Sequence, residues 1–188
     1  MKEKPDNSTV WNAAAIWALA FGAVSTACHV ARYLAMAHLG EKMQVLSAGI
    51  LWAAEFFGCL FLMKECLVRF SVKYPGAELQ DSVKFGRRIA LMSGLILASA
   101  EAISIMQMPD GEISAAFESI AADFSSRLSS EQRDEFLQMA DKMPLVTFLS
   151  QWLYCFLYGS LLSSILSKFL YERRRINGQD DNDNVEDQ

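Results

Sequence analysis

The chain has 188 residues, of which 52% are hydrophobic and 21% charged, and its formal net charge is −5 at pH 7. This length leaves room for one small domain and excludes a separate soluble enzyme domain beside it. The average composition resembles that of soluble proteins, but charged and hydrophobic residues are strongly segregated along the chain.

Four long apolar segments cover about residues 11–36, 45–63, 89–108 and 145–170. Each is near or above the roughly 20 residues that an α-helix needs to cross a hydrocarbon core about 30 Å thick. The first is too long for the apolar part of a cleavable signal peptide, so we expect it to be retained. The sequence thus predicts an all-α fold, an integral membrane four-helix bundle formed by a single domain over residues 11–175.

Basic residues are concentrated in the segments on one side of the predicted membrane. They are Lys2, Lys4, Lys64, Arg69, Lys73, Lys84, Arg87, Arg88, Lys168, Arg173, Arg174 and Arg175. Lys and Arg are retained on the cytoplasmic side, so both the N-terminal residues 1–10 and the C-terminus are expected to be cytoplasmic. The lipid bilayer is one expected partner, and anionic lipid headgroups are candidate partners at this face. A nucleic-acid partner is not expected, because these basic residues lie against the membrane.

The polar segments have predicted structures of their own. The second span should continue as a helix to about Tyr74, where Pro75–Gly76 ends it, and residues 78–88 should form a connector at the membrane surface. The acidic residues 176–188 contain too little apolar surface to order themselves, and we expect a disordered cytoplasmic tail.

The loop over residues 109–144 carries a helical apolar stripe and a capping-box spacing between Ser129 and Gln132. The stripe residues are Ile113, Phe117, Ile120, Phe124 and Leu128. Two short helices that form an extracytoplasmic hairpin between the third and fourth spans are therefore expected.

Small residues recur at every fourth position in three of the spans. They are Ala14, Ala18, Gly22 and Thr26; Ala90, Gly94, Ala98 and Ala102; and Gly159, Ser163 and Ser167. Such ridges let helix backbones approach closely in a membrane. They predict a compact bundle but do not distinguish a monomer from a homo-oligomer.

Glu55 and Glu101 lie inside predicted spans, where a carboxyl group costs a few kcal/mol and is seldom retained without a role. Counting from Arg88 and Lys64 as the inner membrane boundaries places Glu101 about 20 Å and Glu55 about 14 Å deep. They are thus predicted to lie at different depths, with Arg32 as the predicted partner of Glu101. The full candidate polar network is Glu55, Glu101, His29, Arg32, Gln151, Tyr154 and Tyr158. It can be interpreted as a proton or cation site, or as hydrogen bonding that holds the helices together.

The sequence contains no nucleotide-binding, hydrolase or metalloprotease motif of known spacing. The cysteines form no C-x-x-C pair and are expected to be free, small hydrophobic residues. They are Cys28, Cys59, Cys66 and Cys155. We therefore predict no catalytic, cofactor-binding or metal-binding residue and no enzymatic activity.

The order of two close spans, a basic connector ending in Phe85–Gly86–Arg87, a third span, a helical loop, Pro144 and a last span resembles a known family. This family comprises the small four-span bacterial membrane proteins catalogued as domain of unknown function 4199. The resemblance covers about residues 11–170. It implies an inner-membrane location and transfers no activity or functional residues.

Two functions remain open at this point. We expect a non-catalytic envelope component or an accessory subunit of a membrane complex, with a membrane-protein partner or a second copy of the chain. The alternative is a small oligomeric proton- or cation-coupled transporter or channel that uses Glu55 and Glu101.

Overall fold

The computed structural model describes residues 5–38, 40–108, 111–123 and 129–183, and this part of the chain is helical without a β-strand. The elements are α1 (Asn7–His38), α2 (Glu41–Lys73), α3 (Leu79–Met106), α4 (Glu112–Asp123), α5 (Ser130–Gln138), a 3-10 turn (Ala140–Lys142) and α6 (Met143–Asp183). Among these, α1, α2, α3 and α6 are long and apolar enough to cross a membrane. The predicted all-α bundle with four candidate spans is confirmed.

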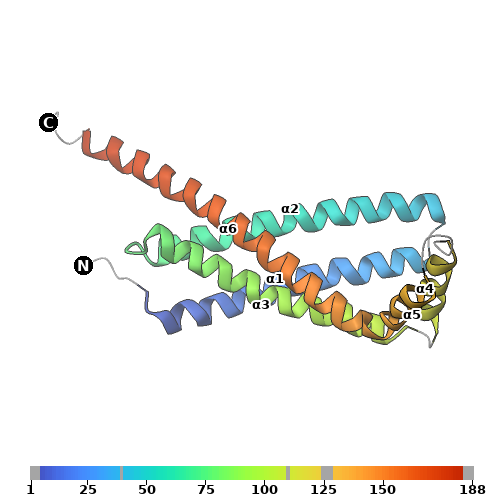
Figure 1. The fold of residues 1–188 in the computed structure, drawn as a ribbon. Helices are drawn as coiled ribbons and strands as arrows, with labels where there is room; N and C mark the ends of the chain where they lie inside the picture. The colour runs from blue at the N-terminus through green and yellow to red at the C-terminus, as the bar shows by residue number, and fades with distance from the viewer. Residues whose placement is uncertain (1–4, 39, 109–110, 124–128, 184–188) are drawn as a thin grey trace.

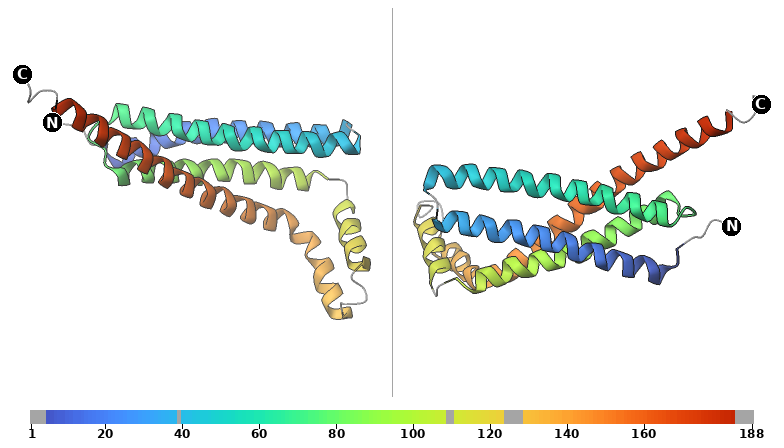
Figure 2. Two further views of the ribbon diagram at one scale, coloured as in Figure 1. Left: turned by 90° about the horizontal axis from the view of Figure 1, so that it is seen from above. Right: turned by 180° about the vertical axis from the view of Figure 1, so that it is seen from behind.

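The four long helices run along a common axis, with α6 crossing the others obliquely (Figure 1). The start of α1 and the end of α6 lie at one end of the bundle, which we call the terminal end (Figure 1). The short helices α4 and α5 lie at the opposite end, the hairpin end, and α4 runs across the spans instead of along them (Figure 2). An even number of spans returns the chain to the side on which it began.

Local sequence explains where α2 ends and α3 begins. Helix α2 ends at Lys73, directly before Tyr74 and Pro75–Gly76, as predicted. Helix α3 begins at Leu79, where Glu78 and Asp81 form a capping box. The predicted surface connector over residues 78–88 is therefore wrong. The capping box starts the helix early, and Gly86 alone is too weak a helix breaker to interrupt it.

Helix α6 begins at Met143 with Pro144 in its first turn, where a missing backbone N–H costs nothing. It then continues to Asp183. The prediction of a disordered tail is therefore wrong for residues 176–183. Extending an existing helix avoids the cost of nucleating a new one, which the composition argument overlooked. Residues 184–188 of the predicted tail lie outside the described part of the chain.

The small residues pack the helices as predicted. Ala14, Ala18 and Ala98 are at most 1% exposed. A Cβ atom added to Gly159 would lie only 2.5 Å from the Cβ of Ala90, which shows how closely α3 and α6 approach. These contacts hold α1, α3 and α6 together, because small side chains let the backbones come near one another.

Helix α2 is packed unevenly along its length. Its buried hydrophobic side chains are Met63, Cys66 and Leu67, followed by Phe70; between residues 43 and 62 none is buried. The ring of Phe70 stacks on that of Phe85 in α3, with centroids 4.3 Å apart. Helix α2 is thus held to the bundle at the terminal end and packs less tightly towards the hairpin end.

The predicted hairpin is confirmed within the described residues. Ser129 Oγ accepts a hydrogen bond from the Gln132 N–H at 3.2 Å, and Gln132 Oε1 accepts one from the Ser129 N–H at 3.0 Å. The rings of Phe117 and Phe136 join α4 to α5 with centroids 4.9 Å apart. Phe124 and Leu128, also assigned to the stripe, lie outside the described residues.

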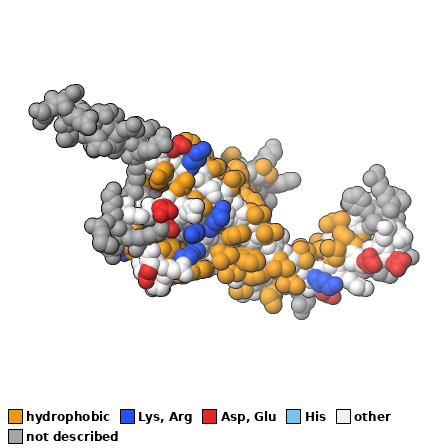
Figure 3. Space-filling view, turned by 60° about the vertical axis from the view of Figure 1, so that its left-hand side comes forward, with side chains coloured by type: hydrophobic (Ala, Val, Ile, Leu, Met, Phe, Trp, Pro, Cys, Tyr) orange, Lys and Arg blue, Asp and Glu red, His pale blue; other side chains and the backbone are white. Residues whose placement is uncertain are grey.

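Lys and Arg side chains gather at the terminal end beside a broad hydrophobic surface (Figure 3). Arg88 on α3 lies 4.7 Å from the ring centroid of Trp11 on α1, and its Nη2 donates to Asn7 Oδ1 at 2.5 Å. Tryptophan and basic residues together are typical of the boundary between hydrocarbon and water.

Candidate functional site

A cavity of about 330 Å³ lies among α1, α2, α3 and α6. Part of its lining consists of the small residues Ala90, Gly94 and Gly159 on α3 and α6. Another part is formed by α2, where Trp52, Glu55, Phe56 and Cys59 are not buried and only Met63 is. The cavity therefore follows from the uneven packing of α2 against an otherwise close-packed set of three helices.

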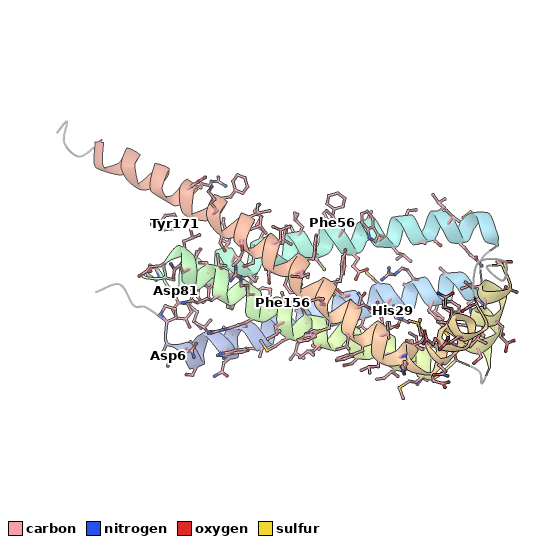
Figure 4. The ribbon with its side chains drawn as sticks, in the orientation of Figure 1. Asp6, His29, Phe56, Asp81, Phe156 and Tyr171 are labelled. Carbon is pink, nitrogen blue, oxygen red and sulfur yellow. The ribbon has the colours of Figure 1, made fainter. Side chains whose placement is uncertain are left out.

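Three ionisable side chains, Arg32, Glu55 and Glu101, line this cavity, and a fourth, His29, is paired with Glu101. Arg32 Nη2 on α1 lies 2.9 Å from Glu55 Oε2 on α2, and His29 Nδ1 on α1 lies 3.6 Å from Glu101 Oε1 on α3. The two carboxylate side chains are the more buried partners, at 17% and 16% exposed. The labelled His29 and Phe56 locate the α1 and α2 portions of the site (Figure 4).

The pairing differs from the predicted Arg32–Glu101 contact. His29 and Arg32 are one helical turn apart, so each meets the carboxylate of a different neighbouring helix. The predicted depths were counted from Lys64 and Arg88 as membrane boundaries, whereas α2 and α3 continue well beyond both residues. Arg32 still acts electrostatically on Glu101, as does Glu55, so the two carboxylates belong to one cluster.

Aromatic rings from α2 and α6 form a second part of the cavity lining. Trp52 stacks on Phe56 at a centroid separation of 5.7 Å, Phe56 contacts Tyr158 at 5.7 Å, and Tyr158 stacks on Tyr154 at 6.2 Å. All of them line the cavity, and we call these four residues the aromatic wall. The hydroxyl of Tyr158 is buried and has no hydrogen-bond partner among the described residues.

The remaining predicted network residue, Gln151, also lines the cavity, and its Nε2 donates to Cys155 Sγ at 3.7 Å. The network residues other than His29 are in the lining, and His29 joins them through Glu101. Sequence reasoning missed Trp52 and Phe56. Their spacing of four residues around Glu55 was an available signal, because residues at such spacings share one helix face.

Charge balance defines what this cluster can do chemically. Ionised Arg32 and Glu55 neutralise one another. His29 and Glu101 are then neutral as a pair only if they hold one proton between them, since an uncompensated charge inside a membrane is costly. A pair of this kind can gain or lose one proton beside the cavity. The described residues contain no group of His, Cys, Asp or Glu able to hold a metal ion.

The fold and the cavity together define a class, an α-helical bundle with four candidate membrane spans and a charged internal cavity. All four cysteines are free, as expected. Comparison of the chain with protein-family models, curated proteins and solved structures finds no match. The resemblance to domain of unknown function 4199 stays a prediction.

Proposed function

We propose that the chain is a multi-pass protein of the bacterial inner (cytoplasmic) membrane with both termini in the cytoplasm. The bacterial assignment rests on the family resemblance described above. The orientation is supported by the basic residues of the terminal end, among them Lys73, Lys84 and Arg87, which follow the rule that Lys and Arg remain on the cytoplasmic side. These side chains would also meet anionic lipid headgroups there.

Within this membrane we propose a function coupled to the movement of a proton or cation, and no enzymatic activity. One observation carries the proposal: the Arg32–Glu55 and His29–Glu101 pairs meet beside a cavity formed by all four spans. Intramembrane ionisable residues are commonly found on ion pathways. A buried ion pair with a purely structural role would be expected to be closely packed and fully hydrogen-bonded, because only then is its desolvation cost offset. A cavity beside the pair does not fit that role.

Proton loss from the His29–Glu101 pair would leave the cavity with one negative charge. That charge favours either the return of a proton or the entry of a cation, so the two ions compete for one site. Four helices enclose little lumen. We therefore propose that transport takes place in an oligomer, in which a second copy completes the path.

Proton flux into liposomes that contain the purified protein tests this proposal. Under an imposed membrane potential, an internal pH-sensitive dye should report flux for the wild type, and both Glu55→Gln and Glu101→Gln should abolish it. Glu118→Gln is the matched control, because Glu118 is exposed on α4. Unchanged helicity by circular dichroism must accompany the loss. A wild type that carries no flux, or a Glu101→Gln variant that keeps it, would contradict the proposal.

The accessory-subunit function is a second candidate that one observation favours. Helix α2 presents large apolar side chains outward, with Val45 75% and Phe57 65% exposed, and such a face suits a helix of another membrane protein as well as lipid. Affinity purification from native membranes tests it. A stoichiometric partner that is lost when Phe57 is replaced by Ala would support this function, whereas recovery of the chain alone would count against it.

A further inference from the structure

We propose that the cavity binds a lipophilic organic cation, such as a quaternary ammonium with an aromatic substituent, in exchange for the proton of the His29–Glu101 pair. This inference rests on the proposed ion-coupled function and adds the chemical class of the ligand. It follows from the juxtaposition of the aromatic wall with a cluster that has one carboxylate more than it has permanent cations.

The aromatic wall supplies a surface suited to such a cation. A cation over a ring face is attracted by the negative face of the π system, most strongly by Trp and also by Tyr and Phe. The wall offers Trp52, Phe56, Tyr154 and Tyr158 in one continuous set of ring contacts. The cavity volume of about 330 Å³ lies at the lower end of the range for small-molecule sites, roughly 300–1,000 Å³.

Charge selects a cation over an anion. The groups that bear on Glu101 are His29 and Arg32 from α1 and Glu55 from α2, with the weakly acidic thiol of Cys155 on α6. Arg32 is the permanent cation among them, and it is bound to Glu55 at 2.9 Å. An entering anion would therefore meet an uncompensated carboxylate. An entering cation instead replaces the departing proton, which passes to water, and the charge in the cavity stays balanced.

The position of the wall indicates how the ligand enters. Trp52 on α2 and Tyr154 on α6 line the cavity and are nevertheless 58% exposed each. In a bilayer these exposed flanks face lipid, so a ligand dissolved in the hydrocarbon region reaches the cavity between α2 and α6 without first crossing to water. This route requires a lipophilic cation and disfavours small hydrated metal ions, which dehydrate reluctantly.

Binding of benzyltrimethylammonium to the purified full chain in detergent tests the inference. Isothermal titration calorimetry in buffers of different ionisation enthalpy should show saturable binding and the release of up to one proton per ligand. Affinity should fall as the pH is lowered, because protons then compete for Glu101. Glu101→Gln should weaken binding at least tenfold and remove the proton release, while the exposed control Glu118→Gln should bind like the wild type.

Trp52→Leu provides a second variant, since Trp52 is 58% exposed and its ring stacks on Phe56 of the same helix. It should weaken binding about three- to tenfold and leave the proton release unchanged. Absence of wild-type binding, or undiminished binding by Glu101→Gln or Trp52→Leu, would overturn the inference. Proton flux without benzyltrimethylammonium binding would refute the ligand class and keep the ion-coupled function. Binding with proton release but no flux would keep the site and refute transport.

Discussion

The backbone of Gly86 in α3 packs directly against the side chain of Ser163 in α6. A Cβ atom on Gly86 would lie only 2.6 Å from the Cβ of Ser163, and Ser163 Oγ donates to the Val83 carbonyl at 3.3 Å. Both residues are buried. This contact sets the approach of α3 to α6 on the terminal side of the cavity.

Gly86→Ala should therefore destabilise the protein by about 1–3 kcal/mol, the usual cost of overpacking a tight core. Gly58→Ala is the matched control, because Gly58 is also in a helix but a Cβ there meets nothing within 4 Å. That change should be neutral or stabilise α2 by up to about 1 kcal/mol. Thermal unfolding of the purified variants in one detergent gives the comparison, and equal melting temperatures for the two variants would contradict the close contact.

Arg32 and Glu55 should be energetically coupled. Arg32→Gln leaves Glu55 without its charged partner and should cost about 1.5–3 kcal/mol, the size of a lost charged hydrogen bond. The double variant Arg32→Gln/Glu55→Gln should recover part of that loss, because no unpaired charge is left. A double-mutant cycle on unfolding free energies in detergent measures the coupling. Additive effects of the two substitutions would show that the pair contributes no interaction energy.

The sequence was sufficient to predict the helices and their packing faces but not the pairing of the charges. Apolar length located the spans, and the four-residue spacing of Ala14 and Ala18 identified a face that is indeed buried. The tilt and offset of neighbouring helices decide which carboxylate pairs with Arg32. Residue spacing within a single helix gives no information on either. The cavity could not be predicted from the sequence either, because it depends on how α2 is packed along its length.

The start of α1 should respond to pH through Asp6, which lies before the first span. Asp6 Oδ1 accepts a hydrogen bond from the Thr9 N–H at 2.8 Å, and Oδ2 accepts one from Ser8 Oγ at 3.1 Å. Hydrogen bonds from Thr9 and then from Ser8 lower the pKa of this carboxyl from its ordinary value of 3.8. These hydrogen bonds make Asp6 a cap of the α1 N-terminus. The cap contributes its full stability above pH 3.8 and is lost as the pH falls through the lowered pKa.

The amide chemical shift of Thr9, followed by NMR in detergent, should titrate with a midpoint below 3.8. Asp6→Asn should keep a hydrogen-bonded cap and show no such titration, since its amide has no proton to gain in this range. A midpoint at or above the ordinary value in the wild type would contradict the capping contact.

The proposed orientation predicts which end of the bundle faces the outside of the cell. With the four native cysteines replaced by Ser, a new cysteine at Ser119 on α4 should react with an impermeant maleimide in intact cells. One at Gln80 on α3 should react only after the membrane is opened. Both positions are exposed, so access to solvent is matched. The opposite labelling pattern would reverse the assignment of the termini.

The uneven packing of α2 leaves one side of the cavity less tightly held than the others. Its buried residues, Met63, Cys66, Leu67 and Phe70, hold α2 to the bundle at the terminal end, whereas Trp52, Glu55 and Phe56 lie on the less tightly packed part of the helix. Movement of that part of α2 would open the cavity while α1, α3 and α6 stay packed together. Loss of the Arg32–Glu55 ion pair would then release this part of α2 from α1.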